Sequence, residues 1–174
     1  MLALPLTLAV LGSCGYSAVR YGADADRAPG VCIRTLENDS QYPGVELLVS
    51  EALRKELLRR GGGRLETDCD RANLMISGRV RPLLRRGHSF SMTAYALEYT
   101  LTLGLDMRVE YRDGRELRLD PAALQYSEIY LGSADVEVER KNRQEAMRRI
   151  SQVLAGRVHD AIDIARVAKG KEER

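Results

Sequence analysis

The sequence has few of the residues on which metal sites and membrane-spanning helices depend. Its 174 residues include two histidines, three cysteines, one phenylalanine and no tryptophan. No apolar run reaches the roughly 18 residues that a spanning helix needs, which excludes a multi-span membrane protein. The 27 Lys and Arg residues stand against 25 Asp and Glu residues, a net charge of +2. Because a protein that coats nucleic acid carries a large basic excess, we expect no nucleic-acid partner.

The sequence also lacks the motifs of common catalytic and nucleotide-binding sites. It contains no G-x-S-x-G, no P-loop, and no G-x-G-x-x-G after a strand. Neither His88 nor His159 has the spacing of a metal ligand. The glycines at 61–63 follow a helical pattern instead of opening one, which indicates the end of a helix and not a phosphate loop. We therefore expect no catalytic residue, no metal and no cofactor.

An apolar stretch stands at the N-terminus, directly before a cysteine. Residues 2–11 read LALPLTLAVL, the length of a signal-peptide core, and the following Gly-Ser-Cys14 completes a segment that resembles the lipobox of bacterial lipoproteins. We expect residues 1–13 to be a lipoprotein signal peptide and Cys14 to carry the lipid. The alternative is a buried N-terminal strand in which Cys14 is a small apolar residue. No Lys or Arg precedes Cys14, which indicates that the basic start of the signal is clipped from this sequence.

The other two cysteines, Cys32 and Cys69, form an even pair. In an exported protein they meet an oxidising compartment, where disulfides persist. Two interpretations stay open, a disulfide between them or two unpaired buried thiols.

Hydrophobic periodicity predicts the secondary structure. Between residues 95 and 111 every odd position is apolar or Tyr, which is typical of an antiparallel strand with one buried face. Apolar residues at helical spacing run from Val45 to Leu57 and again from Ala146 to Ala165. Shorter strand patterns cover 31–37, 72–84 and 116–130, and Pro121 is expected to interrupt the last of these.

These patterns predict one α+β domain over residues 14–168. The expected order is β-α-β-β-β-α, with two helices packed on one face of a mostly antiparallel four-stranded sheet. Residues 169–174 are expected to form a charged tail.

One segment of the chain is strongly basic. There is no acidic residue between Asp70 and Glu98. The candidate ligand contacts in this segment are Arg79, Arg81, Arg85 and Arg86. Guanidinium groups bind phosphate through paired hydrogen bonds, so an anionic lipid or glycolipid is the expected ligand. The alternative is a solvated face that keeps the strand soluble.

Several short motifs together resemble the LptE family of lipopolysaccharide-assembly lipoproteins. They are Leu-Gly-Ser-Cys-Gly-Tyr at 11–16, the helix from Pro43 to Leu57, Ala-Asn-Leu-Met-Ile-Ser-Gly at 72–78, and Glu-x-x-Arg-Arg-Ile-x-x-Val-Leu at 145–154. The resemblance covers nearly the whole chain after the expected signal peptide.

This resemblance implies a non-enzymatic lipoprotein of the outer membrane. In the family, the lipoprotein partners and plugs the LptD β-barrel, binds lipopolysaccharide and assists its assembly at the cell surface. Gly15 after the anchor implies export to the outer membrane, with the body on the periplasmic side and in the barrel lumen. The alternative function is that of an auxiliary lipoprotein of an ABC-type envelope transporter.

Overall fold

The structure is a computed structural model that describes residues 28–61, 63–92 and 96–172. The expected signal peptide, residues 1–13, and the expected lipidation site Cys14 lie outside the described residues. Within the described ranges the chain forms an α+β fold with two α-helices, as the periodicity predicts. The elements follow in the order β1 (Gly30–Ile33), β2 (Glu37–Asn38), α1 (Val45–Arg60), β3 (Arg64–Leu65), the 3-10 helix η1 (Cys69–Arg71), β4 (Leu74–Val80), β5 (Leu84–Phe90), β6 (Ala96–Tyr111), β7 (Glu116–Arg118), β8 (Gln125–Leu131) and α2 (Val136–Glu172).

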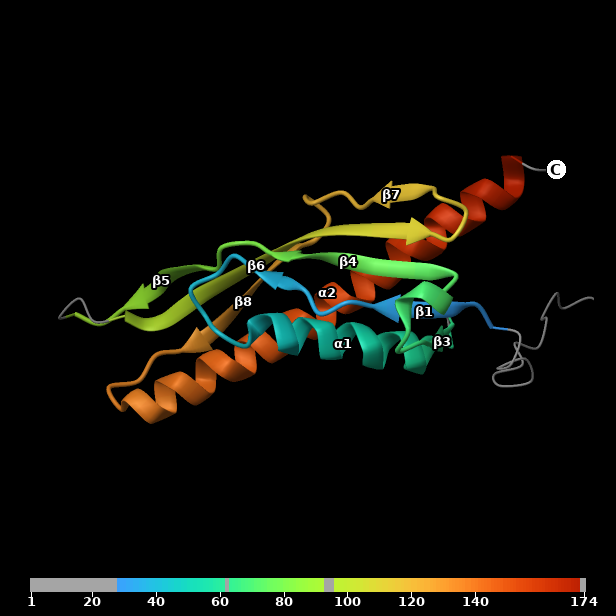
Figure 1. Cartoon of the computed structure of the whole chain (residues 1–174). Helices are drawn as coiled ribbons and strands as arrows, with labels where there is room; N and C mark the ends of the chain where they lie inside the picture. The colour runs from blue at the N-terminus through green and yellow to red at the C-terminus, as the bar shows by residue number, and fades with distance from the viewer. Residues whose placement is uncertain (1–27, 62, 93–95, 173–174) are drawn as a thin grey trace, which may run out of the picture.

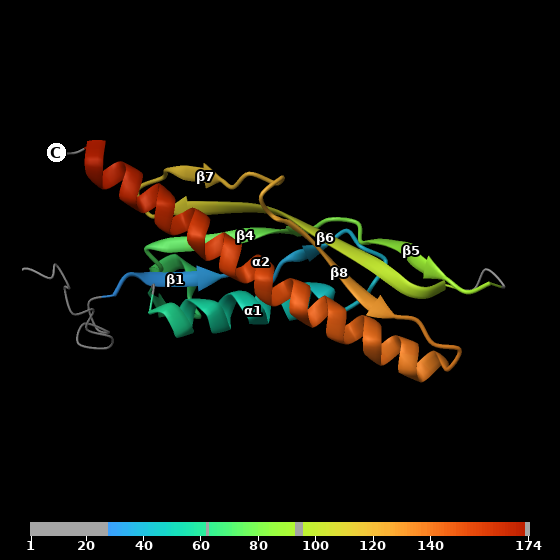
Figure 2. The ribbon, with the colours of Figure 1, turned by 180° about the vertical axis from the view of Figure 1, so that it is seen from behind.

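Strand β6 is the spine of the sheet, and it forms where the period-two pattern places it. It is 16 residues long, and its odd-numbered side chains Leu101, Leu103 and Leu105 are fully buried. Figures 1 and 2 show β6 running along the body with α2 crossing it diagonally. Its C-terminal half pairs with β4 and β7, and its N-terminal half pairs with β5 and β8, all antiparallel. Every other strand is therefore placed directly or indirectly by β6.

The sheet is larger and more mixed than a four-stranded antiparallel one, so that part of the prediction is wrong. In the described part of the chain it has eight strands, in the order β3-β1-β4-β6-β5, with β2 on β4 and with β7 and β8 on β6. Strand β1 pairs in parallel with both β3 and β4, and β2 also pairs in parallel with β4. A parallel pair needs a crossover connection, which α1 supplies. Strands of two or three residues are also too short to show an alternation.

The predicted strand at 72–84 is two strands. The chain leaves β4 after Val80 and enters β5 at Leu84, because Pro82 has no N–H to donate to a ladder. Both strands lie on the same edge of β6, one after the other. As a consequence residues 85–90, for which the periodicity predicts no strand, belong to β5.

Both helices pack on the same face of the sheet, as predicted. Leu53 of α1 and Val158 of α2 meet Ile33, Leu74 and Ile76 around a small cavity of about 20 Å³. Helix α1 ends at Gly61, whose φ of 68° is left-handed and whose N–H donates to the Leu57 carbonyl oxygen at 3.1 Å. This places the core between the helices and the odd-numbered side of β6.

Helix α2 is longer than its apolar pattern. Its first turn is capped by Asp135, whose Oδ1 accepts hydrogen bonds from the N–H groups of Glu137 and Val138 at 2.8 and 3.2 Å. The helix continues through Glu172 and so includes the first four residues of the expected charged tail, 169–174. None of the helices in the described ranges is long and apolar enough to cross a membrane.

Candidate functional site

The four candidate arginines lie on two faces of the sheet and do not form one site. Arg79 is in β4, Arg81 is the first residue after that strand, and Arg85 and Arg86 are neighbours in β5. Side chains alternate along a strand, so Arg85 faces the helices while Arg86 faces the open side of the sheet. The four arginines, which were grouped in the sequence because of their charge, are therefore separated in the structure.

Arg81 holds the middle of the sheet together. Its Nη2 donates to the Pro121 carbonyl oxygen at 3.0 Å and to Gln125 Oε1 at 3.3 Å. Its guanidinium lies over Gly104, where a Cβ atom would collide with it. It also stands 3.7 Å from the Asp106 carboxylate. These contacts bridge β6 at the point where β7 gives way to β8, so Arg81 is a structural residue.

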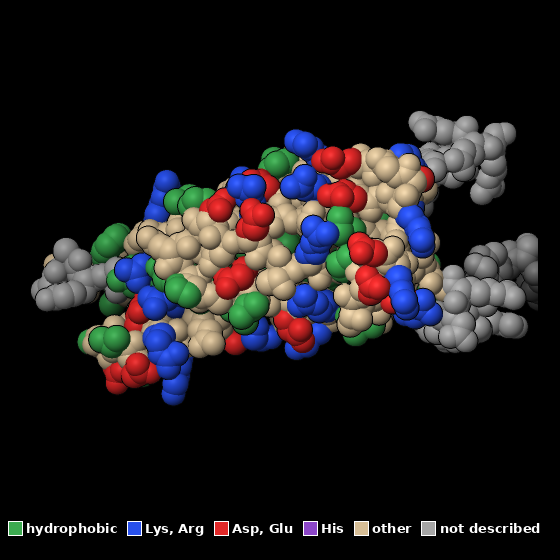
Figure 3. Space-filling model, viewed as in Figure 1, with side chains coloured by type: hydrophobic (Ala, Val, Ile, Leu, Met, Phe, Trp, Pro, Cys, Tyr) green, Lys and Arg blue, Asp and Glu red, His purple; other side chains and the backbone are tan. Residues whose placement is uncertain are grey.

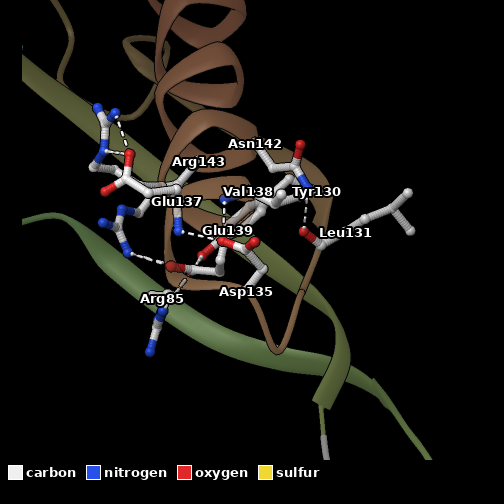
Figure 4. A network of polar contacts seen from close by, with 10 residues as sticks. Arg85, Tyr130, Leu131, Asp135, Glu137, Val138, Glu139, Asn142 and Arg143 are labelled. Carbon is white, nitrogen blue, oxygen red and sulfur yellow. Dashed lines mark hydrogen bonds and ion pairs between the residues drawn. The ribbon is translucent and has the colours of Figure 1, made fainter.

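Arg85 is tied to the first turn of α2, as Figure 4 shows. Its Nη1 donates to Glu139 Oε1 at 3.0 Å and lies 3.5 Å from the Tyr130 hydroxyl, and its guanidinium stacks over the Tyr99 ring at 4.4 Å. The Tyr130 hydroxyl and Arg143 also donate to Glu139, at 2.9 and 3.0 Å. The hydrogen bond to Tyr130 raises the pKa of Arg85, and burial raises the pKa of Tyr130. Arg85 therefore joins β5 to β8 and α2.

Arg79 makes looser contacts on the open face. Its guanidinium is 3.4 Å from Glu37 and 3.5 Å from Asp39, and about half of its side chain is exposed. Exposed ion pairs of this kind contribute little to stability.

Arg86 is the free member of the set. It is exposed, and within the described residues no hydrogen bond or ion pair engages its side chain. It lies opposite Thr100 of β6, and Thr100 lies in turn opposite Ile129 of β8. Arg86, Thr100 and Ile129 are thus aligned across β5, β6 and β8, and Ile129 is an exposed apolar residue.

Exposed apolar side chains gather around this row. Most large apolar side chains that are exposed in the described ranges come from β5, the segment after it, the start of β6, the end of β8 and the start of α2. We call this group the apolar end; its members are Leu84, Phe90, Met92, Leu97, Ile129, Leu131, Val136 and Val138. Figure 3 shows hydrophobic side chains next to Lys and Arg at the left end, where Figure 1 places β5 and the start of α2. Exposed apolar clusters of this kind mark interaction sites.

The sequence did not reveal the apolar end. Each strand contributes only one or two of its residues, so no run of apolar residues marks it. These residues come together only because β5 and β8 both pair with the N-terminal half of β6, and that pairing is not evident from the sequence.

The first turns of α2 carry several arginines, and most of these form ion pairs within the chain. Arg140 pairs with Glu137 at 2.7 Å, and Arg148 pairs with Glu145 at 2.6 Å. Arg149 pairs with Glu128 of β8 at 2.7 Å. These pairs cover the helix surface and fix it to β8.

Cys32 of β1 and Cys69 of η1 are joined as a disulfide, with their Cα atoms 5.1 Å apart. Of the two interpretations left open by the sequence, the structure thus adopts the bridge, which ties β1 to the turn that precedes β4. Within the described residues, no group of three or more His, Cys, Asp and Glu side chains is placed to hold a metal ion.

Comparison with known families gives this geometry a context. The model of the LptE family, described as lipopolysaccharide-assembly, matches residues 28–162. The chain belongs to the LptE family. The match runs from just before β1 to Ile162 in α2, and it confirms the resemblance carried by the sequence motifs. Lipopolysaccharide assembly is therefore the process to which this LptE-family chain is assigned.

One solved structure shows the same fold, and a second is similar to a lesser extent. The crystal structure of rare lipoprotein B from Shewanella oneidensis is 15% identical, covers 80% of this chain and 98% of its own, and gives a TM-score of 0.56. A putative lipoprotein from Caulobacter crescentus is 18% identical over 79% of this chain and 92% of its own, with a TM-score of 0.47. No curated protein matches the sequence. At these identities the first likeness shows that this LptE-family chain shares the fold of a known lipoprotein.

Proposed function

We propose that this LptE-family protein is an outer-membrane lipoprotein that binds lipopolysaccharide and partners the LptD β-barrel during assembly at the cell surface. Family membership supports the process, and the lipobox supports an anchor on Cys14. Attachment through more than one acyl chain binds a membrane stably. In this proposal the anchor lies on the periplasmic side and the folded body plugs the barrel lumen.

One observation carries the ligand part of the proposal, the position of unpaired Arg86 within the apolar end. A lipopolysaccharide presents fatty acyl chains beside phosphorylated sugars, so its binding surface needs apolar side chains next to a cation. The apolar end supplies the first beside Arg86 itself, with Leu84 52% exposed and Ile129 46% exposed on the same side of the sheet. Arg86 supplies the second, because a guanidinium donates two parallel hydrogen bonds to a phosphate.

The other three candidate arginines have different assignments. Arg81 and Arg85 donate to groups of their own chain, so losing either one disturbs the sheet as well as any ligand. Arg79 lies in the half of β4 that pairs with the C-terminal half of β6, away from the apolar end. Arg86 is therefore the residue through which the proposal is tested most directly.

The test is charge reversal at Arg86 in the purified protein. Arg86→Glu is expected to weaken binding to purified lipopolysaccharide, measured by surface plasmon resonance, by about tenfold or more, since a charge-assisted hydrogen bond is worth roughly 1.5–3 kcal/mol. The thermal unfolding midpoint should stay that of the wild type, because the side chain is exposed.

Arg112→Glu is the matched control. Arg112 is also exposed, and it lies in the turn after β6, at the other end of that strand. It should leave binding unchanged. Equal weakening by both variants would indicate general electrostatic attraction, and unchanged binding by Arg86→Glu would remove Arg86 from the ligand site; either result contradicts the proposal.

A further inference from the structure

A groove lies on the open face of the sheet, the face opposite the two helices, over β2, β4, β6 and β7. It is a groove of about 750 Å³, a size typical of small-ligand sites. Its lining is a mixture of polar and apolar surface and includes four arginines, Arg34, Arg79, Arg108 and Arg118. Figure 3 shows acidic and basic side chains side by side along the upper side, where Figure 1 places β4, β6 and β7. We call it the sheet groove.

The strand register places like charges opposite each other in the sheet groove. Arg108 of β6 lies opposite Arg118 of β7, and Ser77 of β4 lies on the other side of Arg108. In the next row Glu110 lies opposite Glu116. Like charges directly opposite in a sheet are destabilising. Exchanging one partner of each row would remove the repulsion, so this arrangement costs stability without helping the fold.

The ion pairs of the groove do not use up its guanidinium groups. Arg79 stands 3.4 Å from Glu37, and Arg108 stands 3.9 Å from Glu110. Arg118 bonds to Glu116 through Nε alone, at 2.9 Å. Elsewhere in the protein arginines make short paired bonds, as Arg59 does to both oxygens of Glu56 at 2.8 and 2.7 Å. Arg108 and Arg118, which line the groove, therefore keep guanidinium N–H groups that these ion pairs do not engage.

The groove offers acceptors as well as donors. The carboxylates of Glu37, Asp106 and Glu110 line it together with the arginines. Carboxylates accept hydrogen bonds from hydroxyl groups, and a pair of guanidinium groups accommodates an anion. A ligand that fits both must carry several hydroxyls and at least one negative group.

We propose that the sheet groove is a binding site for an anionic saccharide, a sugar bearing phosphate or carboxylate groups. The anion lies between Arg108 and Arg118, where it relieves their repulsion, and the sugar hydroxyls donate to the carboxylates of the lining. The site is separate from the apolar end and needs no acyl chain. It rests on the proposed function only for the source of the sugar. That source is the saccharide part of a lipopolysaccharide, and the alternative source is a free sugar phosphate.

The test measures saccharide binding by titration calorimetry and by amide chemical shifts in the full chain. The probes are the delipidated oligosaccharide released from lipopolysaccharide, glucose 6-phosphate, and neutral glucose. We expect the oligosaccharide to bind and to shift the amides of β6 and β7, and neutral glucose not to bind. Binding of glucose 6-phosphate with equal affinity would identify a free sugar phosphate as sufficient.

The variant Arg108→Gln/Arg118→Gln should weaken oligosaccharide binding by about tenfold or more, since two charge-assisted bonds are lost. Both side chains are half-exposed or more, so folding should be preserved. The single variant Arg118→Gln should lose less oligosaccharide affinity than the double variant. Arg112→Gln removes the same charge outside the groove and should have no effect.

Two results would overturn this inference. They are failure of the oligosaccharide to bind the wild type, and binding that the double variant leaves unchanged. Neither bears on the proposed function, since intact lipopolysaccharide is tested separately at Arg86.

Discussion

The arginines of β4 and β5 show how the same side chain takes different roles according to its neighbours. Arg81 lies over a glycine and donates to the backbone of the next connection. Arg85 faces a carboxylate on α2, and Arg86, one residue later, faces solvent. The charge of the segment was evident from the sequence, but the partners of each guanidinium depend on which strand lies beside it.

Removing the Arg81 guanidinium should destabilise the protein. Arg81→Ala loses the bonds to Pro121 and Gln125, and we expect a loss of about 1–2 kcal/mol in the free energy of unfolding, measured by urea denaturation. Gly104→Ala should cost a comparable amount, because its Cβ displaces the same guanidinium.

The two substitutions should not add. If both act through one contact, the free energy of unfolding of the double variant should lie within about 0.5 kcal/mol of that of the less stable single variant. Fully additive losses would show that Arg81 and Gly104 act independently. Lys55→Ala, at an exposed site on α1, is the control and should change stability little.

At the scale of elements, the two helices are joined by a short chain of charges. Glu56 of α1 accepts hydrogen bonds from Arg59 and Arg60, and Arg60 also contacts Asp160 of α2. The bond from Arg59, assisted by that from Arg60 and opposed by burial, lowers the pKa of Glu56 to about 2. The Glu56 carboxylate is thus part of the contact between α1 and α2.

This pKa predicts a pH-dependent contribution to stability. A carboxyl group whose pKa is lower in the folded state stabilises the protein above its unfolded value, near 4.5, and loses that contribution as the pH falls toward 2. Glu56→Gln should therefore cost about 1 kcal/mol at pH 7, on the scale of surface pairs. The difference from the wild type, measured by urea denaturation, should shrink between about pH 5 and pH 2.

Glu51→Gln provides the matched control on the same helix. Glu51 pairs with Lys55 at 3.4 Å and is largely exposed, so its substitution should have little effect at any pH. A Glu56→Gln difference that stays constant down to pH 2 would contradict the lowered pKa.

Elements with long regular patterns formed where the sequence placed them. The odd-numbered apolar residues of β6 and the helical spacing in α1 and α2 each concern neighbours on a single element, so sequence alone reveals them. The division of 72–84 at Pro82 and the parallel pairing of β1 with β4 were not predicted. Both depend on which distant strand supplies the hydrogen-bond partners.

At the scale of the molecule, one end is apolar and the opposite half of the open sheet face is charged. A free soluble protein rarely keeps a cluster of exposed apolar side chains without a partner. The proposed complex with the barrel supplies such a partner, since a plug buries its surface against the barrel wall or against the lipopolysaccharide.

The barrel partnership predicts a copurification result. The lipidated protein, isolated by affinity from outer membranes, should bring down a large β-barrel protein, and Cys14→Ala should abolish recovery from that membrane because the anchor is lost. Recovery with an ATP-binding transporter of the envelope would instead support the alternative function. The absence of a barrel would contradict the partnership.

The sequence by itself determined the fold class, the two helices, the central strand and the family, because these depend on periodicity and short motifs. It also marked the basic segment from which one free arginine emerged. Only the tertiary structure decided which guanidinium groups are engaged, where the apolar end lies and how the rows of the sheet groove align. The physical reason is that burial and hydrogen-bond partners across a sheet are set by register between strands far apart in the chain, and a one-residue change in register would reverse every face.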